Sequence, residues 1–365
     1  MRKRNIAVIS AVAIALLLMC WMLLRIGSEK AYVETPTDKV GMILNGSADD
    51  QGFSQALHEA AEAVCAARDL ELVSCDGVEG GEPFRALAER LIGEGCTLLL
   101  CDSEVYDGDL EALARDYPQI CFLNAMGTVK AHNLASCMRR TYQARYLTGI
   151  VAGMQTETDN VGFLVSSLSQ ETIRQLNAFA LGVRRANPNA TIYVRCTDDR
   201  LDEQKTADTA VALLDAHDID VLSIHAVPVS ALKAADCRGV WTIGYSMPGT
   251  NPYPNTWLTG YTFNWEPFYA ERIDEWREHR FVGHQYRGGI RNGLVSLAPL
   301  SDLVKPGIQD RVDEALAPMM DGSFDVFYGP IRDNYGTLRV REDETLSDDQ
   351  ILHGMSWYAE GVVLE

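Results

Sequence analysis

The chain has 365 residues, with 51 Asp and Glu against 32 Lys and Arg and a formal net charge of −19 at pH 7. So acidic a surface repels phosphate backbones and anionic headgroups, which argues against a nucleic-acid-binding protein and against a body that lies on lipid. About 335 residues follow an apolar amino-terminal segment. A single hydrophobic core usually supports fewer residues than this, so we expect two domains.

The amino terminus has the pattern of a membrane segment. Arg2, Lys3 and Arg4 precede an uncharged apolar run over residues 6–24. Roughly 20 such residues span a bilayer, with the positive flank in the cytoplasm. We expect residues 1–28 to be an uncleaved anchor in the cell membrane, with the body outside the cytoplasm. The alternative is cleavage and lipidation at Cys20, but Met19 is bulky where such signals carry a small residue.

A strand, a polar loop and a helix open the body of the chain. Residues 40–44 are apolar, and an apolar helix face recurs after the loop at Leu57, Ala60, Ala61, Val64 and Cys65. In open α/β sheets such a loop lies at the carboxyl edge of the strands, where ligands bind. Phe53, between Asp50 and Ser54, is therefore interpreted as a stacking surface beside polar groups. The alternative is that Phe53 packs at the helix start and Asp50 caps it.

Strand-like and helix-like segments then alternate. The first series predicts strands at 40–44, 70–74, 97–101 and 120–124 and helices at 55–67, 84–92 and 110–117. The second predicts helices at 142–155, 171–186, 206–217 and 229–234 and strands at 161–165, 191–195, 221–224 and 240–244. Such alternation builds parallel sheets covered by helices. We predict lobe 1 at 38–137 and lobe 2 at 138–260, with 261–365 returning to complete both lobes and a hinge near Asn133, Asn264 and Ala298.

Later segments of the chain resemble the basic membrane protein family of ABC-transporter solute-binding proteins. They are Asn177-Ala178-Phe179, Phe263-Asn264-Trp265, Gly329-Pro330-Ile331 and residues 142–154, 288–290, 297–300 and 344–348, with Gly182, Asn187-Pro188, Asp202 and Lys205. The likeness runs in order from residue 39 to the carboxyl terminus. It implies a two-lobed type I periplasmic-binding fold that captures a purine nucleoside or nucleobase and delivers it to an ABC permease.

Two departures from the family pattern favour a free base over a nucleoside. Nucleoside-binding members carry an acidic residue after the strand that ends here at Gly244, and a lysine near the position of Phe263. This chain has Ser246-Met247-Pro248 and Phe263-Asn264-Trp265 instead. A carboxylate is the best partner for the two hydroxyls of a ribose, so its loss weakens the case for a nucleoside.

The resemblance implies a stacking role for Phe53, and the predicted strands place further candidates at their ends. Asp102 and Asn124 end strands of lobe 1, beside the loop that carries Asp50 and Ser54. Asp102 would accept a hydrogen bond from an exocyclic amine, or alternatively cap a helix.

The candidates in the second half are His225, Ser246, Asn264 and Trp265. His225 would donate to a base nitrogen, or alternatively cap the sheet edge. Asn264 has a donor and an acceptor for one edge of a base, and Trp265 has a large rigid face. The alternative is that Trp265 packs under the hinge and Asn264 turns the chain before Pro267.

Other classes of function find little support. No Gly-x-Ser-x-Gly elbow, Walker loop or His-Glu-x-x-His motif is present, so we expect no enzyme, no cofactor and no bound metal. Nine cysteines match no zinc or redox spacing, and most are expected to be buried and reduced, although one or two disulfides are compatible with the count. We expect a monomer that binds a small molecule. The main alternative is a membrane-anchored sensor of the same fold that signals to a membrane partner.

Overall fold

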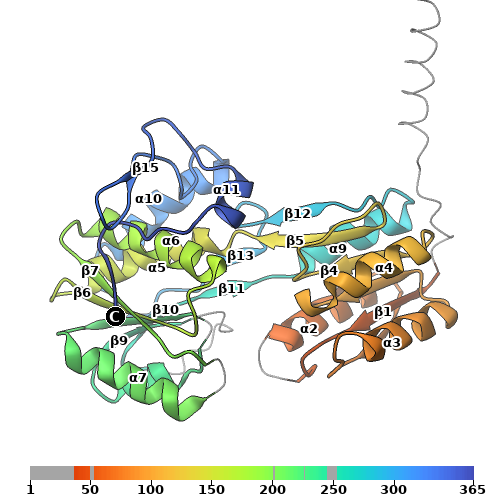
Figure 1. The fold of residues 1–365 in the computed structure, drawn as a ribbon, viewed down its shortest axis with the longest axis horizontal. Helices are drawn as coiled ribbons and strands as arrows, with labels where there is room; N and C mark the ends of the chain where they lie inside the picture. Colours follow the sequence, from red (N-terminus) through yellow and green to blue (C-terminus); the bar gives the residue numbers. More distant parts are fainter. Residues whose placement is uncertain (1–36, 50–52, 200–201, 226, 245–252) are drawn as a thin grey trace, which may run out of the picture.

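The computed structural model describes residues 37–49, 53–199, 202–225, 227–244 and 253–365. They form two lobes, each built on a six-stranded parallel sheet with helices packed against it (Figure 1). The predicted α/β architecture is therefore confirmed. The anchor expected at residues 1–28 lies outside the described residues. Within the described ranges, no helix combines the length and the apolar character needed to cross a membrane.

The first sheet has the order β12-β5-β4-β3-β1-β2. Its strands are β1 (Lys39–Ile43), β2 (Glu71–Cys75), β3 (Leu98–Cys101), β4 (Cys121–Asn124), β5 (Leu134–Arg139) and β12 (Gln285–Gly288). Its helical elements are α2 (Phe53–Ala66), α3 (Glu82–Gly93), η1 (Glu104–Tyr106), α4 (Asp107–Asp116) and α9 (Glu266–Arg277). The predicted apolar face of α2 is buried against this sheet. From β1 the chain adds β2 on one side, and the later strands, beginning with β3, are added on the other. Open sheets bind ligands at such a switch in strand order, here between β1 and β3.

The second sheet repeats this arrangement in the order β10-β9-β8-β6-β7-β16. Its strands are β6 (Asn160–Val165), β7 (Thr191–Cys196), β8 (Val221–His225), β9 (Trp241–Ile243), β10 (Trp257–Thr259) and β16 (Val362–Leu364). Its helices are α5 (Thr141–Gln155), α6 (Gln170–Ala186), α7 (Glu203–Ala216), α8 (Ser230–Asp236), α10 (Ile308–Asp321) and α11 (Asp348–His353). The switch in strand order here lies between β6 and β8.

The chain passes between the lobes three times. It crosses from β5 to α5, returns from β11 (Tyr261–Phe263) to α9, and crosses again from β12 to β13 (Val295–Leu297), which pairs with β11 (Figure 1). A hairpin of β14 (Ile331–Arg332) and β15 (Leu338–Val340) follows. The first crossing follows Arg139, two residues beyond the predicted end of lobe 1, because the unpredicted strand β5 continues the first lobe to that residue. Asn133 lies before β5 and donates to the carbonyls of Tyr117 and Ile120.

The eight cysteines in the described ranges are all free, and five of them are buried: Cys65, Cys96, Cys101, Cys121 and Cys137. Burial raises the pKa of the Cys65 and Cys96 thiols to about 11. These side chains are therefore inert apolar groups of the core.

Helices α5 and α6 pack so closely that their backbones touch. A Cβ atom at Gly149 would overlap the carbonyl oxygen of Phe179, and one at Gly182 would overlap the carbonyl oxygen of Tyr146. Because the obstacle is backbone in both cases, no side-chain rotation relieves it. This contact gives a physical reason for glycine at two positions of the family-like segments.

Replacing Gly182 with alanine should lower the free energy of unfolding by about 1–3 kcal/mol, the usual cost of forcing a carbon into a close-packed contact. Gly108→Ala in α4 is the matched control, because a Cβ there has nothing within 4 Å. Alanine favours a helix over glycine by up to about 1 kcal/mol, so this control should be neutral or slightly stabilising. Urea unfolding measures both variants. Equal stability of the two would contradict the close approach of α5 and α6.

Candidate ligand-binding site

Three aromatic side chains, Phe53, Phe263 and Trp265, form a cluster where the chain passes between the lobes; we call them the aromatic cluster. The ring of Phe53 stands edge-on to Phe263 at 6.3 Å and to Trp265 at 5.6 Å between centroids. Phe263 stacks on Trp265 at 5.4 Å. Such edge-on and stacked pairs are favourable aromatic geometries. Phe53 and Phe263 are only half-buried, so both keep surface for a ligand.

Trp265 is the buried base of this cluster. The side chain is 1% exposed, and Phe263, Phe53 and Phe268 surround it. Its indole nitrogen has no hydrogen-bond partner among the described residues. Asn264 is exposed, and its side-chain oxygen accepts the backbone N–H of Glu266 at 3.2 Å, which turns the chain into α9. Trp265 therefore packs beneath the other two rings, and Asn264 turns the chain before Pro267, as the alternatives to a ligand-binding role expected.

Ser54 and Asp102 fix the start of α2 to the carboxyl edge of the first sheet. The Ser54 hydroxyl donates to one carboxylate oxygen of Asp102 at 3.1 Å, and the backbone N–H of Asn45 donates to the other at 2.8 Å. Both side chains are buried. Because Ser54 follows Phe53 directly, this contact positions the Phe53 ring. Asp50, the neighbouring candidate, lies outside the described residues.

Asn124 lies at the same sheet edge but is fully buried. Its amide donates to the carbonyl of Ser103 at 2.8 Å and to Asp107 at 3.0 Å, and its oxygen accepts the N–H of Met126 at 3.3 Å. These bonds occupy both ends of the amide. Asn124 thus holds the loops after β3 and β4 in place.

Arg139, at the end of β5, is a site residue that sequence analysis did not find. Its guanidinium lies 5.7 Å from the ring centroid of Phe53 and 5.6 Å from that of Phe263. A cation held over two aromatic faces is stabilised by their quadrupoles. Among the described residues, no hydrogen bond or ion pair involves the Arg139 side chain, so its donors are available to a bound molecule.

The second lobe contributes His225, Glu171 and Arg145. Arg145 is fully buried, lies 4.7 Å from the Tyr261 ring centroid, and approaches Nδ1 of His225 at 3.4 Å. Nε2 of His225 lies 2.7 Å from a carboxylate oxygen of Glu171. Arginine only donates, so Nδ1 is the acceptor and Nε2 carries the proton that is donated to Glu171. His225 therefore orients Glu171, at the start of α6.

The Glu171 carboxylate stays ionised and close to Arg139. Partial burial would raise the pKa of Glu171, but the contact with His225 and the charges of Arg174 and Arg139 hold it well below its usual range. Arg139 of the first lobe thus faces an acceptor on the second. A flat molecule between them would meet an aromatic face, hydrogen-bond donors from Arg139 and an acceptor from Glu171. The last candidate, Ser246, lies outside the described residues.

The comparison with known families decides what kind of protein carries this site. A family model described as Bmp, ABC transporter substrate-binding protein PnrA-like, matches residues 37–319. The chain belongs to the Bmp family. The resemblance read from the sequence is confirmed. Membership makes this Bmp protein an ABC-transporter substrate-binding protein that binds a small molecule and a permease, from a family of the cell envelope that is not typically enzymatic.

Three relatives of this Bmp protein are informative. A purine-binding protein of Brucella abortus is 27% identical over 89% of this chain and 92% of its own length. A Haloferax volcanii protein, whose name suggests glucose binding in an ABC transporter, is 29% identical over 86% of this chain and 77% of its own. The solved structure of a transcriptional activator of the comK gene from Bacillus halodurans has a TM-score of 0.71 at 20% identity, covering 78% of this chain and 99% of that one. That likeness shows the fold alone.

Solved solute-binding proteins of ABC transporters share the same two-lobed fold. The predicted periplasmic-binding-protein fold of this Bmp protein is therefore confirmed. Within the described ranges, no group of His, Cys, Asp and Glu is arranged to hold a metal ion.

Proposed function

We propose that this Bmp protein captures a purine base between its two lobes and delivers it to an ABC permease. The observation that carries the proposal is the half-buried pair Phe53 and Phe263 with Arg139 held over both rings. A planar heterocycle has two π-faces for such aromatics and ring atoms that accept hydrogen bonds from a guanidinium. The name of the Brucella relative supports the same ligand class. We place the protein as a monomer on the outer face of the membrane, held by residues 1–28.

A free base fits this site better than a nucleoside. The carboxylate of Glu171 is already bonded to His225 at one oxygen and to the amide of Gln175, 2.9 Å away, at the other. It therefore has limited capacity to hold both hydroxyls of a ribose. With a base, Glu171 needs only one further donor, such as a ring N–H or an exocyclic amine.

Closure of the lobes is the proposed mechanism of capture. The ligand docks on the aromatic face of the first lobe, and rotation about the three crossings brings Glu171, oriented by His225, against its free edge. A ligand shifts the protein toward the closed form only by its differential affinity for that form. Contacts from both lobes supply this difference, and the closed form is the one that engages the permease.

The proposal is tested by thermal shift on the purified full-length chain with adenine, hypoxanthine, adenosine and glucose. A ligand at about one hundred times its Kd adds roughly 2.7 kcal/mol to stability and raises Tm. We expect a shift with the free bases and none with adenosine. A shift with adenosine alone would show that other groups hold a ribose. A shift with glucose alone would show that the ligand is a sugar and not a purine. No shift with any of the four compounds would overturn the proposal.

A sensor that signals to a membrane partner is the second candidate. A Bacillus subtilis relative named transcriptional activator protein med, 22% identical over 80% of this chain and 91% of its own length, supports it, because that name describes a regulatory role. Uptake of labelled adenine by cells with and without the gene separates the two functions. Loss of uptake in the deletion strain supports transport, whereas unchanged uptake by cells whose chain binds adenine supports sensing.

A further inference from the structure

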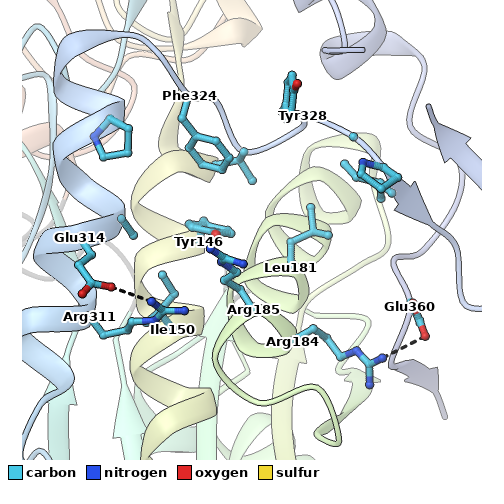
Figure 2. Close-up of a pocket in the computed structure, with 16 residues that line it drawn as sticks. Tyr146, Ile150, Leu181, Arg184, Arg185, Arg311, Glu314, Phe324, Tyr328 and Glu360 are labelled. Carbon is cyan, nitrogen blue, oxygen red and sulfur yellow. Dashed lines mark hydrogen bonds and ion pairs between the residues drawn. The ribbon is translucent and has the colours of Figure 1, made fainter. Parts of the chain in front are cut away.

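A second cavity, of about 550 Å³, lies on the second lobe and shares no residue with the aromatic cluster. Figure 2 shows it between α5, α6, α10 and the segment 324–331. Its volume falls within the range of small-molecule sites, about 300–1,000 Å³. The segment Gly329-Pro330-Ile331, one of the family-like stretches of the sequence, forms part of the wall. Nothing in the proposed capture of a purine uses this cavity.

Tyr146 of α5 lies at the centre of the cavity, beneath Phe324 (Figure 2). Their ring centroids are 5.8 Å apart, and Tyr146 is only 6% exposed. Ile150 and Leu181 add apolar surface beside it. The Tyr146 hydroxyl makes no hydrogen bond to any residue that the structure describes, and its oxygen is not among the fully buried polar atoms, so it is accessible from the cavity. The hydroxyl can therefore form a hydrogen bond with water or with a molecule bound in the cavity.

Three arginines line the same cavity. Arg184 and Arg185 come from the last turn of α6, and Arg311 comes from α10. Arg184 is paired with Glu360 at 3.0 Å and Arg311 with Glu314 at 2.7 Å, as the dashed lines in Figure 2 mark.

Arg185 is the cation of this group without a counter-charge. Its guanidinium makes no ion pair or hydrogen bond within the described ranges, and Figure 2 places Arg185 beside Tyr146. Burial raises the pKa of Tyr146, while the charges of Arg185 and Arg311 oppose that rise, so both cations act on the hydroxyl. The cavity carries an excess of positive charge in a chain whose net charge is −19.

We propose that this cavity is a second ligand site, which binds a small anion built on a compact apolar ring. The carboxylate or phosphate head accepts hydrogen bonds from Arg185 and from the Tyr146 hydroxyl. The ring lies against Tyr146 and Phe324, where it replaces water on two aromatic side chains. The two ion pairs, Arg184 with Glu360 and Arg311 with Glu314, hold the walls in place and leave Arg185 as the anion-binding group.

Four probes separate the features of this ligand: benzoate and phenyl phosphate as ring anions, benzamide as the neutral ring, and inorganic phosphate as the head alone. Titration calorimetry on the full-length chain should give both ring anions a Kd below about 1 mM, a binding free energy of roughly −4 kcal/mol. Benzamide and inorganic phosphate should bind at least about tenfold more weakly, because each lacks one of the two contacts. Comparison of benzoate with phenyl phosphate then identifies the preferred head.

Arg185→Gln locates the binding. This substitution should weaken the binding of benzoate about tenfold, since a charge-assisted hydrogen bond is lost. Arg115→Gln is the matched control, because Arg115 is also an exposed arginine in the last turn of a helix, α4 of the first lobe. That control should bind benzoate as the parent does. Ala315→Trp, which fills the cavity from α10, should abolish binding in a variant whose Tm is unchanged.

Adenine provides the reference for the other site, because saturating adenine should leave benzoate binding unaltered. No saturable binding of either ring anion would overturn the proposal. Equal affinity for benzamide would overturn the anionic class of ligand. Equal loss in Arg185→Gln and Arg115→Gln would show that only the net charge matters and that no built site exists.

Discussion

Replacing Trp265 with alanine is expected to lower the free energy of unfolding by about 3–5 kcal/mol, the usual cost of emptying a packed aromatic site. The indole is 1% exposed and lies between Phe53, Phe263 and Phe268. Its removal leaves a cavity beneath the aromatic cluster that these rings fill only in part. Chemical unfolding of the full-length chain measures the loss. Ligand affinity should fall only to the extent that Phe53 and Phe263 shift.

Trp241→Ala on β9 is the control for this result. Trp241 is half-buried and belongs to the second sheet, so its loss should cost less than that of Trp265. Trp265→Phe keeps an aromatic ring at the site and removes the indole N–H that has no partner, so it should recover much of the stability. If the Trp265→Ala protein kept the parental stability but no longer bound adenine, Trp265 would be a residue that stacks on the ligand.

The elements with clear periodicity could be predicted from the sequence, and the strand without it could not. Helices α2, α5 and α6 were predicted within about two residues at each end, the normal disagreement at helix termini. The strand β5 was missed because its sequence, Leu-Ala-Ser-Cys-Met-Arg, neither alternates nor forms a long apolar run. It lies between β12 and β4, and its side chains are buried on both faces of the sheet, a property that tertiary packing confers. Because β5 was missed, Arg139 at its end was not chosen as a site residue.

Prediction of the candidate site followed the same division. The ends of strands can be recognised in the sequence, so Asp102 and His225 were chosen, and the structure places them at the carboxyl edges of the two sheets. The hydrogen-bond partners of these residues could not be predicted, because they come from distant segments of the chain. Glu171 had one local signal, an acidic residue in the first turn of a helix that follows a strand. Its pairing with His225 lies 54 residues away along the chain.

The two lobes contribute unlike chemistry to the proposed purine site. The first has aromatic surface and the donors of Arg139, and the second has the acceptor Glu171, fixed by His225. Arg139 already acts on the ionisation of Glu171, so opposite charges face one another between the lobes before any ligand binds. This attraction favours approach of the lobes, and a ligand with both an acceptor and a donor edge adds to it. Closure and selectivity would then depend on the same pair of residues.

Phe53→Ala is expected to weaken adenine binding by tenfold or more, because the loss of one stacked aromatic face costs about 1–3 kcal/mol. Phe53 is the half-buried member of the aromatic cluster at the start of α2, and the contact between Ser54 and Asp102 holds that start in place without the Phe53 ring. The fold should therefore survive the change. Calorimetric titration with adenine measures the affinity, and Phe53→Trp should retain it.

Phe324→Ala is the matched control, since Phe324 is also half-buried but lies over Tyr146 in the separate cavity of the second lobe. Its adenine affinity should equal that of the parent chain, while its affinity for benzoate should fall. The two phenylalanines thus report on two sites independently. Adenine binding that Phe53→Ala leaves unchanged would remove the stacking model, and Phe263 with Arg139 would then have to hold the base without it.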